Sequence, residues 1–209
     1  MTRQPRPHSS PTDASKRARQ VPQSAANQST NGPPRRGGHK DEPHPAMLPE
    51  EELWKLCTVE FGRASGPGGQ HRNKVETAVT VRHTPTGIAG GASERRQQYQ
   101  NRAKAMFRLR VRLAQEVRRT IDPRRYVPSE RWESRRQGTK LPVNSQHKDY
   151  PALLAEAMDV VTAMRFDVAG SAGVLRVTMS QLAKLLRNDK RSFSVVNSGR
   201  TSLGLPPLK

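Results

Sequence analysis

The chain has 209 residues, a formal net charge of +19 and a sequence pI near 11.3, with 33% hydrophobic and 4% aromatic residues. This apolar fraction is too low to pack the whole chain, so we expect one or two small domains beside segments without a core. The excess of lysine and arginine implies a polyanionic partner such as nucleic acid, and a membrane partner is not expected because no apolar run approaches membrane-spanning length.

Residues 1–46 are rich in proline, serine, glutamine, asparagine and arginine, and they contain almost no large apolar side chain. Burial cannot offset the entropy of ordering such a segment, so we expect a disordered basic tail. The scarcity of acidic residues also fits a transit peptide, but the frequent prolines and the missing apolar face disfavour the amphipathic helix that such peptides need. We interpret the segment as either an RNA-contacting tail or a solvated arm.

Residues 47–121 begin with a short helical pattern followed by a strand pattern. The sequence Pro-Glu-Glu-Glu over 49–52 places carboxylates at a helix N-terminus and predicts a helix within 48–56. Residues 57–61 alternate, which predicts a strand with Cys57, Val59 and Phe61 on a buried face. Cys57 is the only cysteine, which excludes an internal disulfide and indicates a reducing compartment, which we take to be the cytoplasm.

Two further strands are predicted in the same region. Residues 78–83 alternate again, and Pro85-Thr86-Gly87 provides the turn into a third strand over 88–90. From Ser93, a candidate N-cap, apolar residues at spacings of three and four predict a long helix across the sheet. The apolar positions of that helix are Tyr99, Ala103, Met106, Leu109, Leu113 and Val117. The predicted fold class is therefore α+β, with a small antiparallel sheet and a long packing helix.

The other face of this helix carries nine cations and only two carboxylates, those of Glu94 and Glu116. The many positive charges on this face repel one another unless phosphates neutralise them, so we expect RNA to bind there. The nine cations are Arg95, Arg96, Arg102, Lys104, Arg108, Arg110, Arg112, Arg118 and Arg119.

A glycine-rich loop, Gly66-Pro67-Gly68-Gly69-Gln70, lies between the first two predicted strands. Glycine has no Cβ, so two adjacent glycines leave the main chain uncovered and let another molecule come close to it. Such a loop offers backbone N–H donors to a phosphate, a carbonyl or a developing oxyanion. Considered without its flanking residues, a Gly-Gly-Gln sequence can also be a turn that only links two strands. The cationic or polar residues beside the loop are Arg63, His71, Arg72 and Lys74.

Over residues 59–79 and 83–88 the sequence resembles the catalytic domain of class I peptide chain release factors and of the related codon-independent ribosome-rescue hydrolases. The resemblance ends near Leu113. It implies that Gly68, Gly69 and Gln70 are catalytic, and that this tip enters the ribosomal peptidyl transferase centre and promotes hydrolysis of the peptidyl-tRNA ester. The implied partners are the ribosome, with its rRNA, and peptidyl-tRNA.

We predict RNA contact through the cations nearest the loop and the helix N-terminus. The predicted RNA-binding residues are Arg63, His71, Arg72, Lys74, Arg95, Arg96, Arg102 and Lys104.

No cofactor is predicted, and His71 and His83 lack a cysteine, aspartate or second histidine at ligand spacing, so no metal site is predicted. We expect a monomer.

Residues 122–149 contain prolines and a glycine among arginines and lysines, without an apolar period, and we interpret them as a basic linker. In the rescue hydrolases a basic tail after the catalytic domain lies in the empty messenger channel, and this stretch resembles that tail in charge and placement.

Residues 150–209 are predicted to form a helical C-terminal domain, because apolar spacing returns from Leu153 onward. Asp167 and Thr178 are predicted caps of two short helices, and a fourth helix is indicated near Phe193. The middle pair loosely resembles a helix-turn-helix; a small bundle that packs on the enzyme or on a protein partner is the alternative. The polar face available to a groove or to rRNA would be Ser180, Gln181, Lys184 and Arg187.

Two functions follow from these patterns. The first is a ribosome-dependent peptidyl-tRNA hydrolase that frees nascent chains from stalled ribosomes without reading a codon. The codon independence rests on residues 1–46, which cannot form the separate stop-codon recognition domain of a class I release factor. The alternative is a noncatalytic RNA- or DNA-binding regulatory protein whose C-terminal helices bind nucleic acid.

Overall fold

The structure is a computed structural model that describes residues 35–36, 43–63 and 76–209. The described residues of Pro33–Lys209 belong to one compact unit. Most of the predicted basic tail and the whole glycine-rich loop lie outside the described residues. In the described ranges, no helix combines the length and the apolar character needed to cross a membrane.

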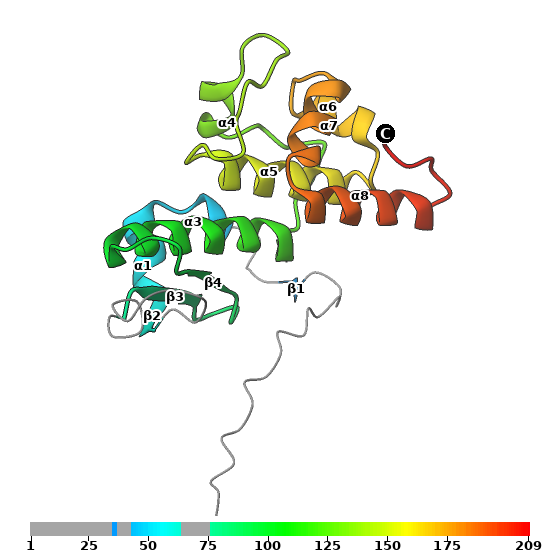
Figure 1. Cartoon of the computed structure of the whole chain (residues 1–209). Coiled ribbons are helices and arrows are strands. Elements are labelled where there is room, and N and C mark those ends of the chain that lie inside the picture. Colours follow the sequence, from blue (N-terminus) through cyan, green and yellow to red (C-terminus); the bar gives the residue numbers. More distant parts are fainter. Residues whose placement is uncertain (1–34, 37–42, 64–75) are drawn as a thin grey trace, which may run out of the picture. The chain divides into compact units, whose positions relative to one another are not determined.

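The sheet contains three antiparallel strands in the order β2-β3-β4 (Figure 1): β2 is Cys57–Gly62, β3 is Ala78–His83 and β4 is Ala89–Ala92. The α+β class is therefore confirmed. Gly87 has a φ of +70° in the turn between β3 and β4, a conformation that glycine adopts without a Cβ penalty. The third strand begins one residue later than predicted.

Phe61 does not lie on a buried face, as its alternation with Cys57 and Val59 predicts. Its side chain is 50% exposed, and Cys57 and Val59 are only half-buried. The long helix α3 (Gln98–Glu116) packs against β3 and β4, while β2 is an edge strand of this sheet. The prediction for Phe61 is wrong because alternation shows which side chains share a face but not whether a helix covers it.

Helix α3 begins later than its predicted N-cap, Ser93. Its N-cap residue is Gln97, and the preceding turn is held instead by Asn101, whose Oδ1 accepts a hydrogen bond from the Arg95 backbone N–H at 2.9 Å. Two predicted apolar positions, Tyr99 and Ala103, are exposed. The buried positions of α3 are Asn101, Ala105, Met106, Leu109, Leu113 and Ala114.

The elements before and after α3 meet at a buried histidine. The 3-10 helix η1 (Pro45–Met47) precedes α1 (Glu50–Lys55), and β5 (Val117–Arg118) pairs in parallel with β1 (Arg35–Arg36). His44 Nδ1 accepts from the Ala46 N–H at 3.0 Å, so Nε2 carries the proton toward the Val117 carbonyl oxygen, 3.2 Å away. Burial lowers the pKa of His44 to about 3, so this histidine is neutral and structural.

The stretch predicted to be a linker contains a helix and a buried tryptophan. Helix α4 (Glu130–Arg135) is capped by Ser129, and Trp132 is fully buried with its Nε1–H donated to the Leu175 carbonyl oxygen at 2.9 Å. A single tryptophan in a polar segment produces no apolar period, which is why the pattern predicts no helix here. The domain boundaries themselves remain a prediction.

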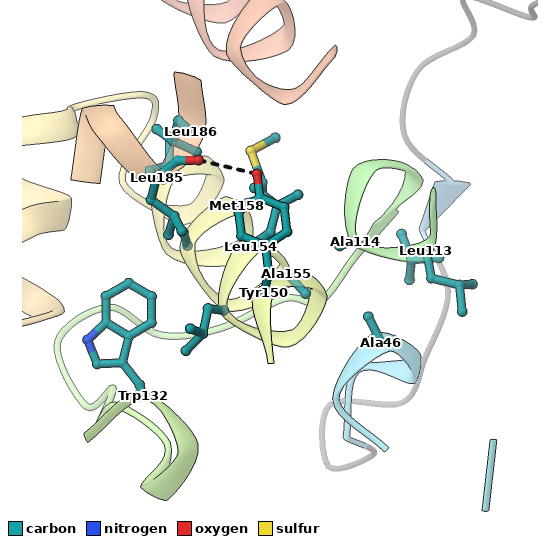
Figure 2. Packing of buried hydrophobic residues seen from close by; sticks show 14 of the residues in the cluster. Ala46, Leu113, Ala114, Trp132, Tyr150, Leu154, Ala155, Met158, Leu185 and Leu186 are labelled. Carbon is teal, nitrogen blue, oxygen red and sulfur yellow. Dashed lines mark hydrogen bonds between the residues drawn. The ribbon is translucent and has the colours of Figure 1, made fainter. Parts of the chain in front are cut away.

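The C-terminal helices are α5 (Tyr150–Ala163), α6 (Val168–Val174), α7 (Met179–Arg187) and α8 (Lys190–Ser202). The predicted caps are confirmed: Asp167 accepts from two backbone N–H groups of α6, and Thr178 Oγ1 accepts from the Gln181 N–H at 3.2 Å. Figure 2 shows Tyr150, Leu154 and Met158 of α5 near Leu185 and Leu186 of α7, with the Tyr150 hydroxyl 3.4 Å from the Leu185 carbonyl oxygen. One core therefore includes side chains of η1, α3, α5 and α7.

Two buried carboxylates attach α5 to the chain between α3 and α4. Glu156 accepts hydrogen bonds from the Tyr126 hydroxyl at 2.9 Å and from the Ser129 N–H and hydroxyl at 2.7 and 2.6 Å. Asp159 accepts from the Arg119 N–H at 3.0 Å. Burial raises the pKa of both carboxyl groups, that of Asp159 to about 7.

Candidate functional site

The three predicted catalytic residues, Gly68, Gly69 and Gln70, lie outside the described residues, as do His71, Arg72 and Lys74. The structure does describe both ends of the segment that contains them. β2 ends at Gly62 and β3 begins at Ala78, and these two residues are paired across the antiparallel ladder. The chain therefore leaves and re-enters the sheet at one point, so the fold holds the two ends of the loop together. The roles of the three residues remain a prediction.

The returning end of this segment is attached to the N-terminal turn of α3. Gln98 Nε2 donates to the Glu76 carbonyl oxygen at 3.0 Å, and Asn101 Nδ2 donates to the Thr77 carbonyl oxygen at 2.7 Å. The same amide nitrogen lies 2.9 Å from the Arg95 carbonyl oxygen. Asn101 is fully buried, so its amide links three backbone groups without competition from water.

Asn101 is a positioning residue that the sequence analysis misses. It occupies a core position in the row Asn101, Ala105, Leu109 and Leu113, where every fourth residue faces the core. A polar residue in such a row must find hydrogen-bond partners inside the protein. That spacing is the feature of the sequence that identifies it.

We expect Asn101→Ala to lower the free energy of unfolding by about 2 kcal/mol, because partly buried backbone groups of Thr77 and Arg95 lose their partner. Thermal and urea denaturation measure this loss. Gln100→Ala is the matched control, since Gln100 is exposed and the expected change is below about 0.5 kcal/mol. Equal stability of the two variants would show that Asn101 does not anchor the segment.

The described members of the predicted RNA-binding set lie around this anchored end. The Arg63 Nε is 3.9 Å from a Glu76 carboxylate oxygen, with both side chains more than half exposed, so this ion pair contributes little. Arg95 and Arg96 are exposed in the turn that Asn101 holds. Arg102 places its guanidinium 4.4 Å from the Trp54 ring centroid, and Lys104 lies 3.5 Å from a Glu94 oxygen.

The rest of the arginine-rich face of α3 is used largely within the protein. Arg108 and Arg112 donate to the carbonyl oxygens of Gly91 and Ala89 in β4, both at 2.7 Å, and Arg110 donates to the Leu48 carbonyl oxygen. Arg118 is buried and donates to the Ala114 carbonyl oxygen at 2.7 Å. Four of the nine cations of this face therefore have backbone carbonyl partners within the protein, while RNA binding by the face remains a prediction.

The remaining reactive side chains have structural roles. Burial raises the pKa of the Cys57 thiol to about 11, so this residue provides no thiolate near neutral pH. His83 is buried with Nδ1 2.8 Å from the Thr86 hydroxyl, and burial lowers its pKa. In the part of the chain that the structure describes, no group of three or more histidine, cysteine, aspartate or glutamate residues could hold a metal ion.

Part of the chain is similar to known proteins. Residues 51–150 match the RF-1 domain. The chain is 53% identical over 79 residues to peptide chain release factor 1 of Acidiphilium cryptum, which is 35% of this chain and 22% of that protein. It is 46% identical over 76 residues to the chloroplastic peptide chain release factor PrfB1 of Arabidopsis thaliana, 35% of this chain and 16% of that protein.

A third relative is peptide chain release factor 2 of Paramagnetospirillum magneticum, 53% identical over 57 residues, or 27% of this chain and 15% of that protein. The matched segments thus span less than a quarter of the length of these three relatives. Residues 51–150 of this chain are therefore similar to the RF-1 domain, and the segments matched by relatives belong to peptide chain release factors.

Proposed function

We propose that the chain hydrolyses the ester bond of peptidyl-tRNA on the ribosome, with Gly68-Gly69-Gln70 as the reacting tip. The observation that carries the proposal is an RF-1 domain in which this sequence lies between the paired residues Gly62 and Ala78. Relatives of the same segment are named peptide chain release factors.

The proposed chemistry requires only a fixed donor and a water molecule. Water attacks the ester carbonyl carbon, and negative charge develops on the carbonyl oxygen and then on the leaving ribose oxygen. The Gln70 backbone N–H donates a hydrogen bond to that charge, while the glycines let the main chain come close enough to do so. The Gln70 side chain fills space beside the ester and admits water in preference to larger nucleophiles.

The described residues would position this tip. Asn101 and Gln98 fix the returning end of the segment to α3, which limits the directions in which the tip can extend. Arg63, Arg95 and Arg96 are exposed beside this anchor and would contact RNA phosphates. The proposed partners are therefore the ribosome, through its rRNA, and peptidyl-tRNA, and we propose that the chain acts as a monomer in the cytoplasm.

We further propose that release does not require a stop codon. This part rests on the resemblance of residues 59–79 and 83–88 to the codon-independent ribosome-rescue hydrolases. The likeness of residues 122–149 to a basic channel-binding tail gives no support. In this stretch Arg135 pairs with Asp149 at 2.6 Å and Arg136 with Glu133 at 2.6 Å, and Trp132 is buried.

A peptide-release assay on purified ribosomes tests both parts. Ribosomes stalled on a messenger truncated at the P site should release peptide when the chain is added, at a rate well above that without it. Release only from ribosomes that hold a stop codon in the A site would contradict codon independence. Occupancy of ribosomes without release from either complex would contradict the hydrolase and favour the noncatalytic nucleic-acid-binding alternative.

A further inference from the structure

The C-terminal helices present a surface whose charge is almost entirely positive. Residues 150–209 contain four carboxylates and eight lysine or arginine side chains. Glu156 and Asp159 are buried, and Asp167 and Asp189 accept backbone N–H groups at the N-termini of α6 and α8. All four carboxylates are thus occupied within the fold, while most of the cations stay exposed.

Helix α7 carries two of these cations on its exposed face. The buried residues of this helix are Leu182, Ala183, Leu185 and Leu186. The exposed polar residues are Ser180, Lys184 and Arg187. No carboxylate occurs between Leu175 and Asn188. The exposed face of α7 therefore offers two cations and a hydroxyl without a competing negative charge on the same helix.

A third cation reaches this face from a distant part of the sequence. The Thr178 N–H donates to the Thr139 carbonyl oxygen at 3.1 Å, and the Gln181 Oε1 accepts from the Leu141 N–H at 3.2 Å. These two contacts hold the exposed Lys140 beside the N-terminal turn of α7. We use the name α7 surface for Lys140, Ser180, Lys184 and Arg187.

Two of the three cations of the α7 surface, Lys140 and Lys184, are available to a ligand. Among the described residues, the Lys140 and Lys184 ammonium groups form no ion pair. Arg187 lies with its guanidinium 5.6 Å from the Phe193 ring centroid and donates to the Lys209 carbonyl oxygen, so its direction is fixed. Glu133 lies across the turn between α6 and α7, where Arg176 and Arg136 neutralise it at 3.7 and 2.6 Å.

We propose that the α7 surface binds RNA through its backbone phosphates. The choice of RNA rests on the proposed function, which places the chain on the ribosome. The order α6, turn, α7 also resembles a DNA-reading helix pair, in which a glutamine reads adenine through both its amide oxygen and its amide nitrogen. The only glutamine of α7 uses its amide oxygen for the Leu141 N–H, and the exposed residues of the first turn are Met179 and Ser180.

The test compares two double variants of the full chain that lose the same charge. Lys140→Gln with Lys184→Gln removes the unpaired cations of the α7 surface, and Lys148→Gln with Arg165→Gln removes two exposed cations elsewhere. Binding to purified ribosomes is measured by sedimentation between about 50 and 200 mM salt, the range over which phosphate contacts weaken most visibly. Circular dichroism and thermal melting confirm that both variants fold.

Each phosphate contact contributes about 0.7 to 0.9 to the slope of log affinity against log salt. The Lys140/Lys184 variant should therefore show a slope about 1.5 less steep than wild type and a dissociation constant raised about tenfold at the lower salt concentrations, a loss of roughly 1.4 kcal/mol. The Lys148/Arg165 variant should change the dissociation constant less than about twofold. Equal changes in the two variants, or an unchanged slope, would overturn the proposal.

A second measurement locates the contact. In a Cys57→Ser background the chain has no other cysteine, so Ser180→Cys can carry a single iron-EDTA group. This probe should cleave the rRNA backbone, and the same probe at Arg165→Cys should not cleave the same sites. Absence of cleavage from position 180, or tighter binding to a DNA duplex than to ribosomes, would overturn RNA as the ligand. Neither measurement depends on peptide release, so failure of the hydrolase proposal would be seen separately.

Discussion

A Gly69→Ala chain is expected to release peptide about 100-fold to 1000-fold more slowly than the wild type, the usual loss when one preorganised oxyanion donor is removed. In the proposed mechanism the added Cβ would restrict the backbone and fill the space through which the ester approaches, so the Gln70 N–H would no longer meet the developing charge. Single-turnover release at saturating protein measures the chemical step apart from binding.

Two comparisons make this prediction specific. Gln70→Ala retains the backbone N–H and should keep partial activity, so it should be the milder change. Ribosome binding of the Gly69→Ala chain should equal that of the wild type, because no cation is altered. Wild-type release by the Gly69→Ala chain would remove the catalytic assignment of the loop.

The second large effect is expected at Gly90 in β4, where the sheet meets α3. A Cβ at this position would lie 2.3 Å from the Leu109 backbone nitrogen, 2.5 Å from the Ala105 carbonyl oxygen and 2.8 Å from the Leu109 Cα. These atoms belong to the backbone of a helix and cannot move aside as a side chain would. Gly90→Ala must therefore push α3 away from the sheet, and we expect a loss of about 3 kcal/mol in the free energy of unfolding.

The neighbouring glycine is the matched control for this experiment. A Cβ at Gly91 would lie 3.6 Å from the Thr80 hydroxyl oxygen, an ordinary van der Waals distance. Gly91→Ala should therefore change the free energy of unfolding by less than about 1 kcal/mol, as measured by urea denaturation. Equal stability of the two variants would show that α3 does not approach β4 as closely as described.

The Gly90 contact also affects the proposed active site. α3 carries Asn101, which holds the Thr77 carbonyl at the returning end of the Gly-Gly-Gln segment. The α3 backbone lies directly on Gly90, so a displaced α3 would move the anchor of the loop with it.

Local sequence patterns predict much of this fold correctly. Alternating side chains identify β2 and β3, the Pro-Thr-Gly turn separates β3 from β4, and Asp167 and Thr178 mark the starts of α6 and α7. Each of these features depends on residues within a few positions of one another, so the sequence contains the necessary information. The RF-1 match likewise follows from a contiguous segment around the Gly-Gly-Gln loop.

The amino-acid sequence by itself determined the α+β class, the caps of α6 and α7 and the candidate catalytic loop. Only the tertiary structure decided which cations have partners within the protein: Arg108 and Arg112 donate to β4 carbonyls, whereas Lys140 and Lys184 are exposed without an ion pair in the described part of the chain. It also decided that Trp132 is buried and that Phe61 and Tyr99 are exposed. The physical reason is that these outcomes depend on contacts between segments far apart in the sequence, which no local period records.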